Sequence, residues 1–206
     1  MKTLFKIYPL MIVALLFTTM SCDEESIIEE EVVSLTTQEI QTLQFLIEEE
    51  KLARDVYLFL NDLHDHYVFK NISGSEQKHI YFVQQLLQEY EIENPASEER
   101  GVFQNEEIKA LYITLTELGS QSLEKAFIVG ATIEDLDIND LNRAILSTDK
   151  EDLIQVFRKL RCGSRNHLRA FTSQLEELGS SYSPQYLSES EYNEILEGEH
   201  ESCGSI

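Results

Sequence analysis

The chain has 206 residues and a formal net charge of −22, because 38 acidic side chains face only 16 Lys and Arg. Such a surface repels nucleic acid and anionic lipid headgroups, which argues against functions that depend on binding either. The length suffices for one domain with a sizeable core. With only 3 prolines and 8 glycines, and little alternation of β-branched residues, the sequence favours long helices.

The first 21 residues are typical of an export signal. Lys2 and Lys6 give a positive start, and the apolar run 10–17 that follows is too short to span a bilayer. Cys22 stands where a lipoprotein signal peptidase would leave a lipidated N-terminus, with ordinary cleavage nearby as the alternative. Because diacylation anchors a chain stably, we expect an exported lipoprotein of the bacterial cell envelope, held at the outer membrane or the periplasmic face.

Composition divides the rest of the chain into three parts. Residues 22–35 are expected to form an acidic, disordered tether, because six of the nine residues after Cys22 are Asp or Glu and repel one another. The helical bundle is expected over residues 36–180. A C-terminal tail with one short helix is expected over residues 181–206.

Apolar residues recur at spacings of three and four along four long segments, which predicts an all-α, four-helix bundle. A short extra helix lies on the long crossover between the second and third, and a weak amphipathic helix lies in the tail. The long helices are expected at about 36–64, 75–91, 122–146 and 149–178, and the two short ones at about 106–118 and 188–196.

Two breaks between helices carry recognisable capping residues. Asn71–Ser75 is expected to separate the first long helix from the second, and Thr148 with Glu151 is expected to form a capping box before the last. An oxidising compartment would permit a bond between Cys162 and Cys203, but the sequence leaves that pairing open.

Each long helix places a carboxylate or an imidazole on its apolar seam. An ionised carboxylate buried without a partner is very costly, so these groups must be protonated, paired or bound to a metal. The four seams of a bundle meet at one axis, and four carboxylates would balance two divalent cations. The candidate metal ligands are Glu50, Glu76, His79, Glu134, Asp137 and His167.

Neighbouring polar residues are interpreted differently. Glu48 and Glu49 are expected to be solvated. The nearby basic residues are expected to point away from the seam: Arg54, Lys78 and Arg165. Glu76 and His79 share a helix face at a spacing of three. A second Glu-x-x-His at Glu197 and His200 lies in an acidic tail without an apolar seam, and is rejected as a ligand pair.

Three further residues have two interpretations each. Tyr57 and Tyr90 can donate hydrogen bonds to ligands, although packing in the core is the favoured use. Gly130, with Ala131 beside it, can leave room for oxygen or peroxide or can allow close helix packing.

The order Glu, Glu-x-x-His, Glu and a second His is the di-metal pattern of ferritin-like bundles. The stretch EKLARDVY at 50–57 resembles the first ligand helix of rubrerythrins. Over about residues 36–197 the chain resembles a ferritin-like bacterial and archaeal family called domain of unknown function 2202. The further stretches that carry this resemblance are 75–79, 130–138, 163–171 and 183–188.

The resemblance implies a site for one or two divalent metal ions, with iron favoured and manganese as the alternative. It further implies oxidation of ferrous iron or reduction of oxygen or peroxide. Ser164 departs from the pattern, which expects Glu three residues before the last His, so a second metal depends on Asp137. An enzyme would need an external electron donor, since no CxxC pair is present. The alternatives are a non-catalytic metal-binding module and a bundle without metal.

Overall fold

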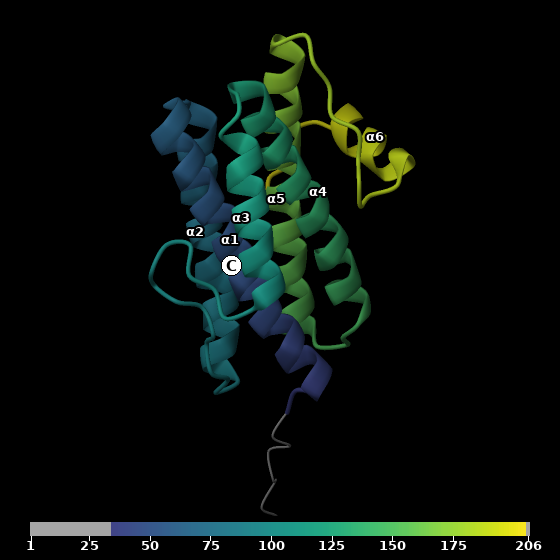
Figure 1. Ribbon diagram of the computed structural model, residues 1–206. Helices are drawn as coiled ribbons and strands as arrows, with labels where there is room; N and C mark the ends of the chain where they lie inside the picture. Colours follow the sequence, from purple (N-terminus) through teal and green to yellow (C-terminus); the bar gives the residue numbers. More distant parts are fainter. Residues whose placement is uncertain (1–33, 205–206) are drawn as a thin grey trace, which may run out of the picture. The chain divides into compact units, whose positions relative to one another are not determined.

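The computed structural model describes residues 34–204, and this part of the chain contains six helices and no strand (Figure 1). The expected all-α bundle with a helix on its crossover is confirmed. The export signal and Cys22 lie outside the described residues. The helices are α1 (Thr37–His64), α2 (Tyr67–Glu89), α3 (Glu106–Gly119), α4 (Leu123–Leu146), α5 (Glu151–Glu177) and α6 (Glu189–Glu197). Among residues 34–204, no helix is both long enough and apolar enough to cross a membrane.

The four long helices pack as two pairs, α1 with α2 and α4 with α5. The crossover helix α3 lies along α1 and α4, and α6 packs against α5 (Figure 1). Short connections between the members of each pair make them neighbours, whereas the long crossover joins one pair to the other.

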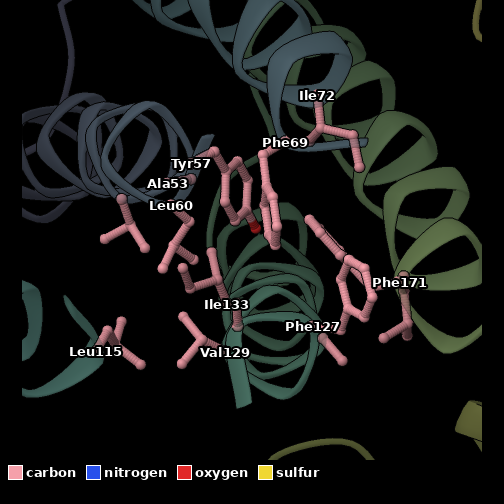
Figure 2. Packing of buried hydrophobic residues seen from close by; sticks show 14 of the residues in the cluster. Ala53, Tyr57, Leu60, Phe69, Ile72, Leu115, Phe127, Val129, Ile133 and Phe171 are labelled. Carbon is pink, nitrogen blue, oxygen red and sulfur yellow. The ribbon is translucent and has the colours of Figure 1, made fainter. Parts of the chain in front are cut away.

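Two apolar clusters fill the bundle, one on each side of a polar belt. The first contains stacked and tilted rings from all four long helices, among them Phe69 and Phe127 with centroids 5.5 Å apart (Figure 2). The second is mostly aliphatic and includes Ile47, Val83 and Leu160. Along α1, Glu50 follows Ile47 of the second cluster and precedes Ala53 of the first. The candidate ligands therefore lie where the two clusters meet.

The break expected at Asn71–Ser75 is wrong, because α2 begins at Tyr67 and continues through it. Phe69 and Ile72 are buried in the first cluster, which fixes these turns as helix. His66 caps the start, with its Nδ1 accepting from the Val68 N–H at 3.4 Å. A mid-helix glycine costs about 1 kcal/mol relative to alanine, and the two buried side chains outweigh that cost.

The capping box expected at Thr148 and Glu151 is also wrong. Helix α5 has Lys150 at its N-cap, without a side-chain cap. Thr148 instead donates to Glu39 Oε1 at 2.5 Å. Glu39 completes a capping box with Thr36 at the start of α1, where its Oε2 accepts from the Thr36 N–H at 2.7 Å. One carboxylate thus joins the starts of α1 and α5, a long-range contact that local sequence does not reveal.

The tail after α5 folds back on the bundle and is fixed at two places. Asp135 of α4 accepts from the hydroxyl of Tyr182 at 2.8 Å and from the N–H groups of Gln185 and Leu187 at 2.6 and 2.8 Å. A disulfide joins Cys203 to Cys162 of α5, which answers the question that the sequence left open.

Candidate metal centre

Glu76 of α2 lies at the centre of the polar belt, between the two imidazoles. Its Oε2 is 2.8 Å from His79 Nδ1, and its Oε1 is 2.8 Å from His167 Nδ1. Glu50 Oε2 lies 3.1 Å from His79 Nδ1, and Glu134 Oε2 lies 3.4 Å from His167 Nδ1. The four long helices therefore bring five of the six candidate ligands together.

These five residues form two sets of three that share Glu76. One set contains Glu50, Glu76 and His79, and the other contains Glu76, Glu134 and His167. In each set one atom per residue lies within 4.8 Å of the other two. All five side chains are between 1% and 8% exposed, so water does not satisfy them.

The residues fit a pair of divalent cations, because three converging ligand atoms lack a hydrogen-bond partner, whereas His79 Nδ1 is hydrogen-bonded to Glu50 Oε2 at 3.1 Å. Glu50 Oε1, Glu76 Oε1 and His167 Nδ1 are buried and have no partner of hydrogen-bond geometry, although the last two atoms are 2.8 Å apart. A bound cation requires ligand atoms whose lone pairs point toward it and are not used as hydrogen-bond acceptors. Oxygen ligands mixed with imidazole suit iron or manganese.

Without a metal, protons take the place of cations in this cluster. Burial alone would lower the pKa of His167, but Glu76 and Glu134 outweigh it and raise that pKa to about 9. Burial likewise opposes protonation of His79, yet the charges of Glu76 and Glu50 raise its pKa well above the usual value. Burial raises the pKa of Glu50 to about 7, despite the opposing effect of His79. Metal binding must therefore displace protons.

Tyr57 holds one of the ligands by a hydrogen bond. Its hydroxyl donates to Glu134 Oε1 at 2.5 Å, and its ring lies 5.2 Å from that of Phe171. Burial, followed by the charge of Glu134, raises the pKa of Tyr57 well above its usual range, so the phenol keeps its proton. Tyr57 thus both packs in the core and orients a ligand. Tyr90 instead donates to Asp152 at 2.5 Å, away from the candidate ligands.

Asp137, the sixth candidate, lies outside both sets. Ser164 Oγ donates a short hydrogen bond to Asp137 Oδ2, while Asp137 Oδ1 is buried without a partner. Ser164 occupies the position where the di-metal pattern expects a glutamate. Ser164 and Asp137 are thus hydrogen-bonded to each other where the pattern expects a metal-binding glutamate.

Glu48 and Glu49 are buried, which corrects the expectation that both are solvated. Glu48 accepts from the N–H groups of Gln104 and Asn105, each at 2.7 Å. Glu49 has no hydrogen-bond partner, and burial together with nearby Asp140 raises its pKa well above the usual value. The segment just before α3 covers Glu48, and Glu49 lies near Asp140 of α4; no local pattern in α1 signals either neighbour.

The basic residues beside the candidate ligands point elsewhere, as expected. Arg54 donates to Asp55 at 2.7 and 2.9 Å and to Gln77 at 2.7 Å. Arg165 is paired with Glu201 of the tail.

Two glycines allow helices to approach closely around the centre. A Cβ at Gly130 would lie 2.5 Å from the Phe171 ring, so close packing, and not space for oxygen, accounts for this glycine. A Cβ at Gly163 would lie 2.5 Å from His79 Nε2. Helix α2 can therefore bring His79 against α5 only where residue 163 lacks a side chain. This role of Gly163 was not predicted, although a glycine on the ligand-bearing stretch of α5 was the available signal.

The rejected Glu-x-x-His copy in the tail belongs to neither ligand set. Both Glu197 and His200 are exposed. His200 nevertheless lines an open pocket whose walls include the His79 and His167 side chains.

Comparisons with known proteins extend over the helices that build this centre. The family profile described as "Uncharacterized protein domain (DUF2202)" matches residues 39–199. The uncharacterized protein MJ0754 of Methanocaldococcus jannaschii is 48% identical over 163 residues, which is 79% of this chain and 88% of that protein. The crystal structure of hypothetical protein MJ0754 has a TM-score of 0.80 at 47% identity, covering 81% of this chain and 96% of the other. Since the matched range includes every helix that carries a candidate ligand, this chain belongs to the DUF2202 family.

Proposed function

We propose that this chain is a ferritin-like, metal-binding lipoprotein of the cell envelope that holds two divalent cations. The observation that carries the proposal is the pair of ligand sets sharing Glu76, with buried ligand atoms that lack hydrogen-bond partners. The donor set favours iron, with manganese as the alternative. Ferrous iron oxidation, or reduction of oxygen or peroxide, is the proposed activity.

Bound iron would supply reversible one-electron chemistry. The chain's own residues would position and protect it. The imidazoles of His79 and His167 present Nδ1 to the centre, and Glu76 offers one carboxylate oxygen to each side. Tyr57 keeps a proton at its hydroxyl and donates it in a hydrogen bond to Glu134. The two cysteines within residues 34–204 are joined in the disulfide, so electrons would come from an external donor.

Metal analysis of protein purified without chelators, followed by anaerobic titration with ferrous iron, tests the binding proposal. We expect two ions per chain. His79→Ala should lower the metal content, whereas His200→Ala, in the rejected tail motif, should leave it unchanged. Equal losses from the two variants would contradict the assignment, and no bound metal in wild-type protein would overturn it.

A non-catalytic metal-binding module is the second candidate function. The hydrogen bond from Ser164 to Asp137 favours it, because that carboxylate is already engaged and the last helix lacks the glutamate of a symmetric centre. Oxygen consumption after anaerobic loading with iron separates the two functions. Repeated turnover supports the enzyme, while stable stoichiometric binding without oxygen consumption supports the module.

The envelope location rests on the sequence of the first 22 residues, which lie outside the described structure. Substitution Cys22→Ala should release the chain from membrane fractions, whereas His200→Ala should not. Membrane retention of the Cys22 variant would contradict lipidation at this position.

A further inference from the structure

An open pocket of about 770 Å³ lies between α2, α5 and the C-terminal tail. Its walls include the two imidazoles and Gly163, which meets His79 Nε2. Tail residues 200–204 form another wall. The pocket thus connects the surface with the histidine side of the candidate metal centre.

The tail wall is fixed to α5 by several bonds. The disulfide holds Cys203, and Asn166 exchanges two hydrogen bonds with the backbone of Glu201, at 3.0 and 2.9 Å. The Glu201 carboxylate accepts from Arg169 at 2.8 Å and from Arg165 Nε at 2.8 Å. The hydrogen bond from Arg165 is the main reason that the pKa of Glu201 falls to about 2. Two guanidinium groups therefore neutralise the one carboxylate that lines the pocket.

Two lysines give the pocket a charge opposite to that of the whole chain. Lys78 of α2 and Lys159 of α5 both line it, and neither forms a salt bridge with an acidic side chain of residues 34–204. Lys159 Nζ lies 4.0 Å from the centroid of the Phe82 ring, which keeps the ammonium group at the pocket wall. In a chain of net charge −22, two unpaired ammonium groups beside one pocket attract anions and repel divalent cations.

We propose that this pocket binds a small inorganic anion next to the imidazoles of His79 and His167. Lys78 and Lys159 supply the charge, and Asn166, Ser75 and the fixed tail supply polar walls. Access of the bound anion to a metal ion rests on the proposed function. The binding itself does not, because the lysines and the tail are in place without a metal.

Titration of the metal-free, disulfide-bonded full-length chain with sulfate tests the proposal, with ionic strength held constant by chloride. The chain has five histidines, and their ring C–H signals can be followed by NMR. We expect shifts that saturate at His79, His167 and His200, which line the pocket. The signals of His64, the last residue of α1, and His66, the N-cap of α2, serve as internal controls and should not move. Equal movement of all five, or no movement, would overturn the proposal.

Matched lysine variants make the test specific. Lys78→Gln combined with Lys159→Gln should weaken sulfate binding roughly tenfold, since each partly exposed charge contributes modestly. Lys109→Gln removes an exposed lysine that pairs with Glu106 on α3 and should have no effect. Cys203→Ser should free the tail and remove the His200 shift. Unchanged affinity in the double variant would contradict the assignment.

The same preparations distinguish this inference from the proposed function. Iron binding without a sulfate response would reject the pocket alone. A sulfate response in a protein that binds no iron would reject the metal centre and leave the anion site standing.

Discussion

Six of the buried carboxylates form two groups of three that differ in their partners, not in their burial. Glu48, Asp55 and Asp135, here called the saturated carboxylates, accept from backbone N–H groups, and Asp55 also from Lys51 at 2.5 Å and from Arg54. Glu50, Glu76 and Glu134, the open carboxylates, have imidazoles or the Tyr57 hydroxyl as partners instead of backbone N–H groups. Members of both groups are about 1% exposed or less.

This difference shows that burial alone does not identify a metal ligand. Glu134 and Asp135 are adjacent in the sequence and equally hidden, yet they face different neighbours. Asp135 accepts from N–H groups of the loop at residues 185–187, while Glu134 faces Tyr57, His167 and Glu76. A saturated carboxylate stabilises the fold, and an open one keeps lone pairs for a cation.

The largest expected effect comes from a matched pair of substitutions at these adjacent positions. Asp135→Asn should lower the free energy of unfolding by about 3 kcal/mol, because its amide cannot accept from all the buried donors that the carboxylate satisfies. Glu134→Gln should change metal-free stability by less than about 1 kcal/mol, since burial and Glu76 already raise the pKa of Glu134. Urea unfolding measures both. Equal losses would erase the distinction between the two groups.

Removing the shared ligand should sharpen the comparison on the binding side. Glu76→Gln removes a carboxylate oxygen from both ligand sets and should weaken metal binding more than about a hundredfold. This loss exceeds the one expected from removing a residue that only hydrogen-bonds to a ligand. Asp55→Asn, in a saturated carboxylate, should leave the metal content per folded chain unchanged. Competition with a chromophoric chelator gives the affinities, and a normal affinity for the Glu76 variant would exclude it as the shared ligand.

Much of this contrast could be predicted from the sequence. The helical seams located four long helices and the five residues that converge, because periodicity and a buried charge are local signals. The tail motif, rejected because it lacks an apolar seam, belongs to neither ligand set.

The errors concern residues whose surroundings come from distant parts of the chain. Glu48 is saturated by the N–H groups of residues 104 and 105, and α2 extends through Asn71–Ser75 because Phe69 and Ile72 are buried against other helices. Neither effect is encoded within one helix. That Asp137 is a metal ligand stays a prediction, and its hydrogen bond with Ser164 of another helix is likewise not signalled by the local sequence.

Metal-free protein should lose stability as the pH rises from about 7 to 9. His167 faces Glu76 on α2 and Glu134 on α4 and stacks on His79, and its pKa rises from the usual 6.5 to about 9. Because the pKa of His167 is higher in the folded than in the unfolded chain, its protonation stabilises the fold fully below about pH 6.5. This contribution is lost as the pH rises through about 9. The pKa of Glu50, raised to about 7 by burial, acts in the same direction at lower pH, so its contribution is lost between about pH 4.5 and 7.

The loss should be on the order of 2 kcal/mol, measured by urea unfolding at several pH values in the presence of chelator. Metal affinity should change in the opposite sense and rise with pH, because ligands must release protons. Metal-free stability that rises between pH 7 and 9 would contradict the protonated cluster.

The smallest expected effect separates the two ligand sets from each other. Tyr57→Phe removes the hydrogen bond to Glu134 but keeps the ring against Phe171. Metal affinity at the position formed by Glu76, Glu134 and His167 should fall about tenfold. This is the lower end of the roughly 10- to 100-fold loss expected when a residue that orients a ligand is removed. The position with Glu50 and His79 should keep its affinity, because Tyr57 donates to no oxygen of that set. Tyr90→Phe, which removes a bond to Asp152 away from the centre, is the matched control. A titration in which both positions weaken equally would mean that Tyr57 supports the bundle as a whole and not the Glu134 side of the centre.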